Sequence, residues 1–267
     1  MLLLNEANVL RYLIRSGRIR SDHAQHWVCR RQEARWNEIF LVECQRDDGP
    51  ALESWFVKQP TFPLAHATVG IDTEVQAYRV MGQEPALDAY LPGRPFEAFY
   101  DAGNRIMVLE NLSGYALVTP ELHTGNVNLR TGEFAREVGR MMGTFHAHLE
   151  RKRLSGKHEP EAVAFPAVMP SLLRDRAVAV DSLINFPSCE RFRQSLRKFL
   201  LSSDVKPLLD ELEESWEFSH LIHGDAAFRN LLFRAAQRTP LALELRWVDW
   251  ETAAWSDPHW DFALFFW

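Results

Sequence analysis

The chain has 267 residues, which is enough for one large domain or for two lobes that share a cleft. Apolar residues make up 46% of the sequence and charged residues 25%, as in an ordinary protein with a sizeable core. The formal net charge of −6 argues against a general nucleic-acid binder, which needs a basic surface.

The cysteines and the N-terminal residues indicate where the protein works. The 3 cysteines form no CxxC pair, which argues against a disulfide framework and a structural zinc site and favours a reducing compartment. Asn5 and Glu6 come too early for the apolar core of a signal peptide. No apolar run approaches the roughly 20 residues that cross a bilayer. We therefore expect a cytoplasmic protein that does not contact a membrane.

Residues 1–112 predict a strand-rich unit. Apolar residues at helical spacing follow Asn5 and end before Gly17, a typical helix stop. Alternating and β-branched segments with an Asp-Gly turn signal between them then indicate strands. The expected elements are a helix over 5–15, strands over 40–45 and 54–59, a helix over 73–81 and a strand over 105–112.

Residues 113–132 contain several glycines and Pro120 and are expected to form an ordered loop. From Phe134 to Leu149 the apolar residues fall on one helical face. Further helices are expected over 171–185, 189–202 and 204–216, and short strands over 230–233 and 245–250. A strand-rich part, 1–112, followed by a helix-rich part, 113–267, predicts an α+β fold with two lobes and a hinge between them.

The segment LIHGDAAFRNLLF, residues 221–233, is the most informative for chemistry. An apolar strand leads into His223-Gly224-Asp225, and Asn230 opens the next apolar strand. Further on, Asp249 ends the apolar stretch WVDWE. Phosphoryl transfer needs a carboxylate that orients the acceptor hydroxyl and accepts its proton, and hard oxygen ligands that hold Mg²⁺. Asp225, Asn230 and Asp249 supply these groups.

The pattern HGDxxxxN followed by an aspartate on a strand is similar to the aminoglycoside phosphotransferase and choline kinase superfamily, relatives of the protein kinases. The resemblance covers residues 26–267. It includes WFVKQ with Lys58, TEVQAYRVM with Glu74, the hinge-like MVLENL, the helix EVGRMMGTFHAHL, and SDPHWDFAL over 256–264. The resemblance therefore implies a bilobal, protein-kinase-like fold.

The resemblance also implies roles for single residues. Lys58 would hold the α- and β-phosphates of ATP, and Glu74 would pair with Lys58. The backbone at Glu110 to Leu112 would meet the adenine. Asp225 would be the catalytic base, and the Mg²⁺ ligands would be Asn230 and Asp249. Asp261 would brace the catalytic loop.

Two features depart from the family pattern. The stretch RRQEARWNEIFLVE, where a phosphate-binding loop should lie, contains no glycine, although its Asn37 matches the family's entry to the second strand. The sequence also stops shortly after the segment 256–264, where family members continue with helices that help to build the acceptor pocket.

Two other interpretations remain open at this point. The missing glycines are compatible with a catalytically weak, pseudokinase-like module that binds nucleotide or a partner protein. A non-haem iron oxygenase would use His223, Asp225 and His259 as its ligands. That alternative leaves Lys58, Asn230 and Asp249 without a role.

The acceptor is the least determined part of the prediction. The resemblance implies a hydroxyl-bearing small molecule or a serine or threonine of a peptide. The last six positions hold five large apolar residues, namely Phe262, Leu264, Phe265, Phe266 and Trp267. We expect them to be buried, either within the chain or against a protein partner that completes the acceptor site.

Overall fold

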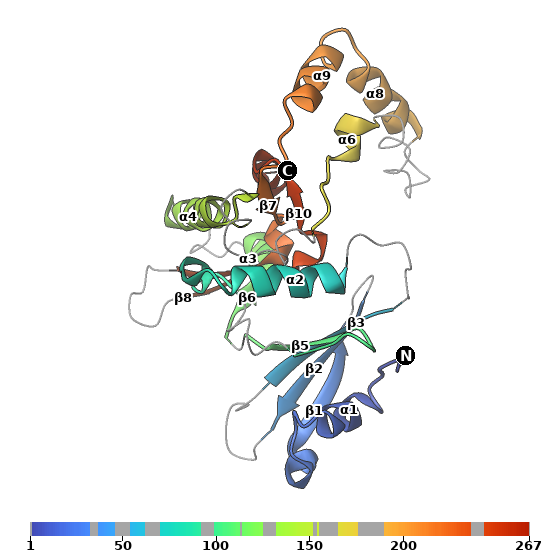
Figure 1. Cartoon of the computed structure of the whole chain (residues 1–267), viewed down its shortest axis with the longest axis vertical. Helices are drawn as coiled ribbons and strands as arrows, with labels where there is room; N and C mark the ends of the chain where they lie inside the picture. Colours follow the sequence, from blue (N-terminus) through green and yellow to red (C-terminus); the bar gives the residue numbers. More distant parts are fainter. Residues whose placement is uncertain are drawn as a thin grey trace.

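A computed structural model describes residues 2–32, 37–45, 54–61, 70–91, 99–112, 114–124, 132–151, 154, 165–175, 190–235 and 243–266. A strand-rich part carries the N-terminus at one end of the molecule, and helices α8 and α9 lie at the opposite end (Figure 1). The α+β architecture expected from the sequence is confirmed.

The strand-rich part is a five-stranded antiparallel sheet with the order β1-β2-β3-β5-β4. Its strands are β1 (Trp27–Gln32), β2 (Asn37–Cys44), β3 (Ser54–Pro60), β4 (Phe99–Asp101) and β5 (Ile106–Glu110). The strands expected over 40–45, 54–59 and 105–112 are present as β2, β3 and β5. The sequence did not predict β1 or β4, and β4 has only three residues, too few for an alternating pattern.

The two faces of the sheet pack against different partners. Val57 points to the face that is covered by α1 (Val9–Arg15). There it joins a separate core with Phe40 and Val108. Because side chains alternate along a strand, the neighbouring Lys58 points to the opposite face. On that face lies α2 (Ile71–Met81), whose buried side chains join the main core.

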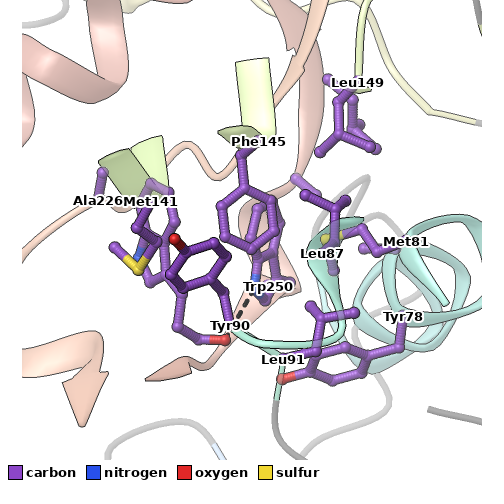
Figure 2. Close-up of a cluster of buried hydrophobic side chains, with 14 of the residues drawn as sticks. Tyr78, Met81, Leu87, Tyr90, Leu91, Met141, Phe145, Leu149, Ala226 and Trp250 are labelled. Carbon is purple, nitrogen blue, oxygen red and sulfur yellow. Dashed lines mark hydrogen bonds between the residues drawn. The ribbon is translucent and has the colours of Figure 1, made fainter. Parts of the chain in front are cut away.

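Helix α2 lies between the sheet and the helical part (Figure 1). Tyr78 and Met81 of α2 belong to the same apolar cluster as Phe145 of α4 (Gly132–His148) and Trp250 (Figure 2). The helix therefore connects the sheet to the core of the second half. The division into units 1–112 and 113–267 stays a prediction.

The second half contains the helices α3 (Val118–Thr124), α4, α6 (Ser171–Arg174), α8 (Glu190–Leu200), α9 (Lys206–Glu214) and α10 (His259–Phe266). Its strands form one pair, β7 (His220–Ile222) with β10 (Ala254–Ser256), and one three-stranded sheet, β6 (Ala116–Leu117), β8 (Leu231–Ala235) and β9 (Leu243–Trp247). Short 3₁₀ turns, η1 (Ser21–His26), η2 (Pro85–Leu87), η7 (Phe228–Asn230) and η8 (Trp250–Thr252), complete the described elements.

Two expectations for the second half need correction or restriction. The loop expected over 113–132 is wrong for 116–124, which form β6 and α3. Pro120 is tolerated there because it lies in the first turn of α3, where its missing N–H has no helical partner. Helix α6 covers only the start of the helix expected over 171–185, and residues 176–189 lie outside the described range.

Three residues of the apolar C-terminal segment, Phe262, Leu264 and Phe265, pack against the chain itself. Phe265 is buried, and its ring centroid lies 4.4 Å from that of Phe228 in the main core. Phe262 and Leu264 also pack against this core. These three residues therefore need no protein partner to cover them. The side chains of Phe266 and Trp267 lie outside what the structure describes. None of the described helices combines the length and the apolar character of a membrane span.

Candidate active site

Lys58 on β3 lies at the centre of a cluster of carboxylates. Its Nζ lies 2.7 Å from Oε2 of Glu74, 2.5 Å from Oδ1 of Asp249 and 3.1 Å from Oε2 of Glu251. The ion pair with Glu74, expected from the sequence, is therefore present. Glu74 is in turn held by Tyr78, whose hydroxyl donates to Oε1 over 3.2 Å. Residues from β3, α2 and the η8 turn thus meet at one point.

Burial and charge act in opposite directions in this cluster. Burial alone lowers the pKa of the Lys58 ammonium, but Glu74, Asp249 and Glu251 raise it by more, so the net pKa is raised. Burial raises the pKa of the Glu74 carboxyl, and the Lys58 ammonium opposes that shift. Lys58 is therefore a charged cation within a cluster of carboxylates.

Asp249 occupies an unusual backbone conformation at the end of β9. Its φ of 68° and ψ of 55° lie in the left-handed region, which aspartate tolerates better than most residues. The turn ends the strand and starts η8, so that Asp249 points toward Lys58. The preceding residue, Val248, donates its N–H to the carbonyl of Asn230 over 3.0 Å, which fixes Asp249 next to the start of β8.

The loop between β7 and β8 is held by two buried side chains. The carboxylate of Asp261, which is 1% exposed, accepts the N–H of His223 over 2.9 Å and the N–H of Gly224 over 3.0 Å. The expected bracing role of Asp261 agrees with these contacts. Nδ1 of His223 accepts the N–H of Asp225 over 3.2 Å, and Nε2 faces the carbonyl of Val248 at 2.9 Å. Nε2 therefore carries the proton, and burial lowers the pKa of this imidazole.

Asp225 and Asn230 face each other across this loop. Nδ2 of Asn230 donates to both the backbone carbonyl and Oδ2 of Asp225, each over 2.9 Å. This leaves Oδ1 of Asn230 as its possible metal ligand. Arg229, which precedes Asn230, pairs with Oδ1 of Asp225. The carboxylate of Asp225 remains partly exposed, with 32% of its side-chain surface accessible.

The carboxylates near Lys58 can also be tested as a metal site. Within the described residues, Glu74, Asp249 and Glu251 form a group whose ligand atoms all lie within 4.8 Å of one another. Carboxylate and carboxamide oxygens are the ligands that Mg²⁺ prefers, so this donor set fits that ion. Asp249 and Glu251 retain accessible oxygens, whereas Glu74 is buried against Lys58 and Tyr78.

Glu251 was not predicted from the sequence. It follows Asp249 by two residues in WVDWE, and that spacing is its only sequence signal. Its position depends on the left-handed turn at Asp249 and on the following 3₁₀ turn, neither of which the sequence pattern indicates.

The predicted adenine-binding segment follows β5. The backbone N–H of Asn111 donates to the carbonyl of Ser54 over 2.9 Å, and Glu110 pairs with Trp55 of β3 in the sheet register. The carbonyl of Leu112 accepts the N–H of Tyr115 over 3.0 Å, just before β6. The segment therefore connects the five-stranded sheet to the second half of the chain, and its contact with adenine stays a prediction.

The arrangement does not support an iron centre built from His223, Asp225 and His259. Both ring nitrogens of His223 are engaged inside the protein. The His259 side chain is 88% exposed, and its Nδ1 contacts Asp257 over 2.8 Å at the start of α10. Among the residues that the structure describes, these three side chains therefore form no common metal site.

Comparison with known proteins agrees with this geometry. A family model described as "Phosphotransferase enzyme family" matches residues 18–267. No curated protein matches the sequence at a significant level.

Solved structures with the same fold include several kinases. A choline/ethanolamine kinase family protein from Mesorhizobium loti has a TM-score of 0.50 and 17% identity, over 89% of this chain and 62% of its own. A mutant aminoglycoside 2′-phosphotransferase-IIIa in complex with GDP has a TM-score of 0.57 and 16% identity, over 97% and 76%. An ethanolamine kinase from Plasmodium vivax has a TM-score of 0.57 and 13% identity, over 99% and 68%. The chain thus spans less than two thirds of the length of the Mesorhizobium protein.

Proposed function

The chain belongs to the phosphotransferase enzyme family, and we propose that it transfers the γ-phosphoryl group of ATP to a hydroxyl group of an acceptor, with Mg²⁺ as the cofactor. The observation that carries this proposal is the meeting of Lys58, Glu74 and Asp249 in one ion-paired cluster. A backbone hydrogen bond between Val248 and Asn230 ties this cluster to the loop of Asp225.

Each residue has a proposed task in the reaction. Lys58, oriented by Glu74, binds the α- and β-phosphates, and the backbone from Glu110 to Leu112 binds the adenine. Asn230, Asp249 and Glu251 would hold Mg²⁺, which would supply positive charge against the phosphates.

Asp225 performs the proton transfer. It orients the acceptor hydroxyl and takes its proton while the acceptor oxygen forms a bond to the γ-phosphorus. The bond from that phosphorus to the β–γ bridging oxygen breaks, and ADP leaves with the electron pair. Asn230 supports this step because its amide holds Oδ2 of Asp225 in a fixed direction.

The acceptor is proposed to be a small hydroxyl-bearing molecule, and the reaction is proposed to take place in the cytoplasm. The names of the solved relatives, which include choline/ethanolamine, aminoglycoside and ethanolamine kinases, favour a small acceptor over a peptide. Screening amino alcohols, amino sugars and serine- or threonine-containing peptides with labelled ATP distinguishes these classes.

Nucleotide binding is the first test of the proposal. Mg·ATP at 100 times its Kd is expected to stabilise the folded chain by about 2.7 kcal/mol, because it binds the folded state only. Replacing Lys58 by methionine is expected to weaken binding about 10- to 100-fold, since the phosphates lose a charged donor. Scanning calorimetry measures the stabilisation, and titration calorimetry on the folded proteins measures the affinities.

Two further variants serve as controls for that measurement. Lys58→Arg keeps the positive charge and is expected to retain part of the affinity. Lys206→Met changes an exposed lysine of α9 and should leave the affinity unchanged. No binding of Mg·ATP to the wild-type chain would contradict the proposal, as would equal binding by the wild type and Lys58→Met.

A further inference from the structure

Glu251 connects three segments of the strand-rich part to the η8 turn. Its Oε2 accepts a hydrogen bond from Nδ2 of Asn37 over 3.0 Å and lies 3.1 Å from Nζ of Lys58. Its backbone carbonyl accepts the N–H of Gly70, directly before α2, over 2.8 Å. Glu251 of the η8 turn therefore contacts the start of β2, the residue before α2 and the middle of β3.

Asn37 is the first residue of β2 and is separated from Glu251 by 214 positions in the sequence. The contact is partly buried, and its acceptor is a carboxylate. Hydrogen bonds to charged groups are stronger than those between neutral groups, because the acceptor carries a full charge. The Asn37–Glu251 contact is thus a strong link between β2 and η8.

The surroundings of Glu251 explain why a neutral donor is useful there. Lys58 has three N–H donors and faces three carboxylates, those of Glu74, Asp249 and Glu251. A phosphate that approaches Lys58 competes with these carboxylates for the same donors. The carboxamide of Asn37 is a donor to Glu251 that is separate from the ammonium of Lys58.

We propose that Asn37 is a positioning residue. It holds the Glu251 carboxylate next to Lys58, so that β2 and the η8 turn stay in contact when the Mg²⁺-bound nucleotide binds. This inference rests on the proposed function.

The test compares the affinity for ATP with Mg²⁺ and with excess EDTA, measured by calorimetry on the full chain. Asn37→Ala is expected to weaken Mg·ATP binding about 10-fold, because Glu251 loses a charge-assisted donor. Asn37→Asp is expected to weaken it more, because two carboxylates would then face each other. Gln45→Ala is the matched control, since Gln45 is exposed beyond the other end of β2.

A double-mutant cycle with Glu251→Ala decides whether Asn37 acts through Glu251. In the Glu251→Ala background, the further change Asn37→Ala is expected to alter the Mg·ATP affinity less than about 3-fold. Equal affinity of the wild type and Asn37→Ala would overturn the inference, as would fully additive effects. A lower melting temperature with an unchanged ratio of Mg·ATP to ATP affinity would show a structural role only. Failure of the wild type itself to bind Mg·ATP would refute the proposed function instead.

Discussion

Replacing Asp225 by asparagine is expected to lower kcat for phosphoryl transfer about 10³-fold, because a carboxamide cannot accept the proton of the acceptor hydroxyl. The affinity for Mg·ATP should change little, since the proposed nucleotide contacts lie on Lys58, the 110–112 backbone, Asn230, Asp249 and Glu251. The melting temperature should also stay similar, because the Asp225 side chain is partly exposed. The rate is measured with labelled ATP and the best acceptor from the screen.

Asp88→Asn makes the same chemical change at an exposed position outside the site and should keep the wild-type rate. A loss of less than about 10-fold in Asp225→Asn would mean that Asp225 does not act as the base. A large loss of Mg·ATP affinity in the same variant would instead assign Asp225 to nucleotide or metal binding.

Gly224→Ala is expected to have the largest effect on stability, a loss of about 2 to 5 kcal/mol in the free energy of unfolding. Gly224 has a φ of +76°, which residues with a Cβ rarely adopt. An added Cβ would lie 2.5 Å from the backbone carbonyl oxygen of Thr252. The loop cannot shift easily, because Asp261 holds the N–H groups of His223 and Gly224. Chemical denaturation with one spectroscopic probe measures the loss.

The chain provides a matched control for this change. Gly139 lies on an exposed face of α4, where an added Cβ meets nothing within 4 Å. Gly139→Ala is therefore expected to stabilise the protein by about 0.5 to 1 kcal/mol, because alanine favours the helix. Unchanged stability of Gly224→Ala would show that the close contact with Thr252 relaxes without cost.

The sequence predicted the parts of the site that lie on regular elements or in a recognisable motif. Lys58 lies in WFVKQ on β3, where it shares a face of the strand with Phe56. Glu74 lies on the helix that follows, and the predicted ion pair between Lys58 and Glu74 is present. The HGDxxxxN spacing identified Asp225 and Asn230, whose side chains meet over 2.9 Å.

Other features could not be predicted because they depend on tertiary contacts. Glu251 reaches Lys58 only because Asp249 adopts a left-handed conformation, and Asn37 meets Glu251 across 214 positions of the sequence. The strands β4, β6 and β10 have two or three residues each, too few to carry a periodic pattern. They are defined by the strands with which they pair.

The C-terminal residues show a different limit of sequence reasoning. Their apolar character correctly indicated burial for Phe265, but it could not distinguish burial within the chain from burial against a partner. The contact of Phe265 with Phe228 shows that Phe265 is buried within the chain, and Phe228 belongs to the η7 turn that ends at Asn230. Helix α10 thus packs against the turn that carries Asn230.

The most direct test of the proposed mechanism is a crystal structure with Mg²⁺ and a non-hydrolysable ATP analogue. The account predicts the α- and β-phosphates on Nζ of Lys58, and the cation on oxygens of Asn230, Asp249 or Glu251 at about 2.1 Å. The γ-phosphate should face the carboxylate of Asp225 across a space that fits a hydroxyl group. A nucleotide bound away from Lys58, or a cation that contacts none of these three residues, would contradict the account.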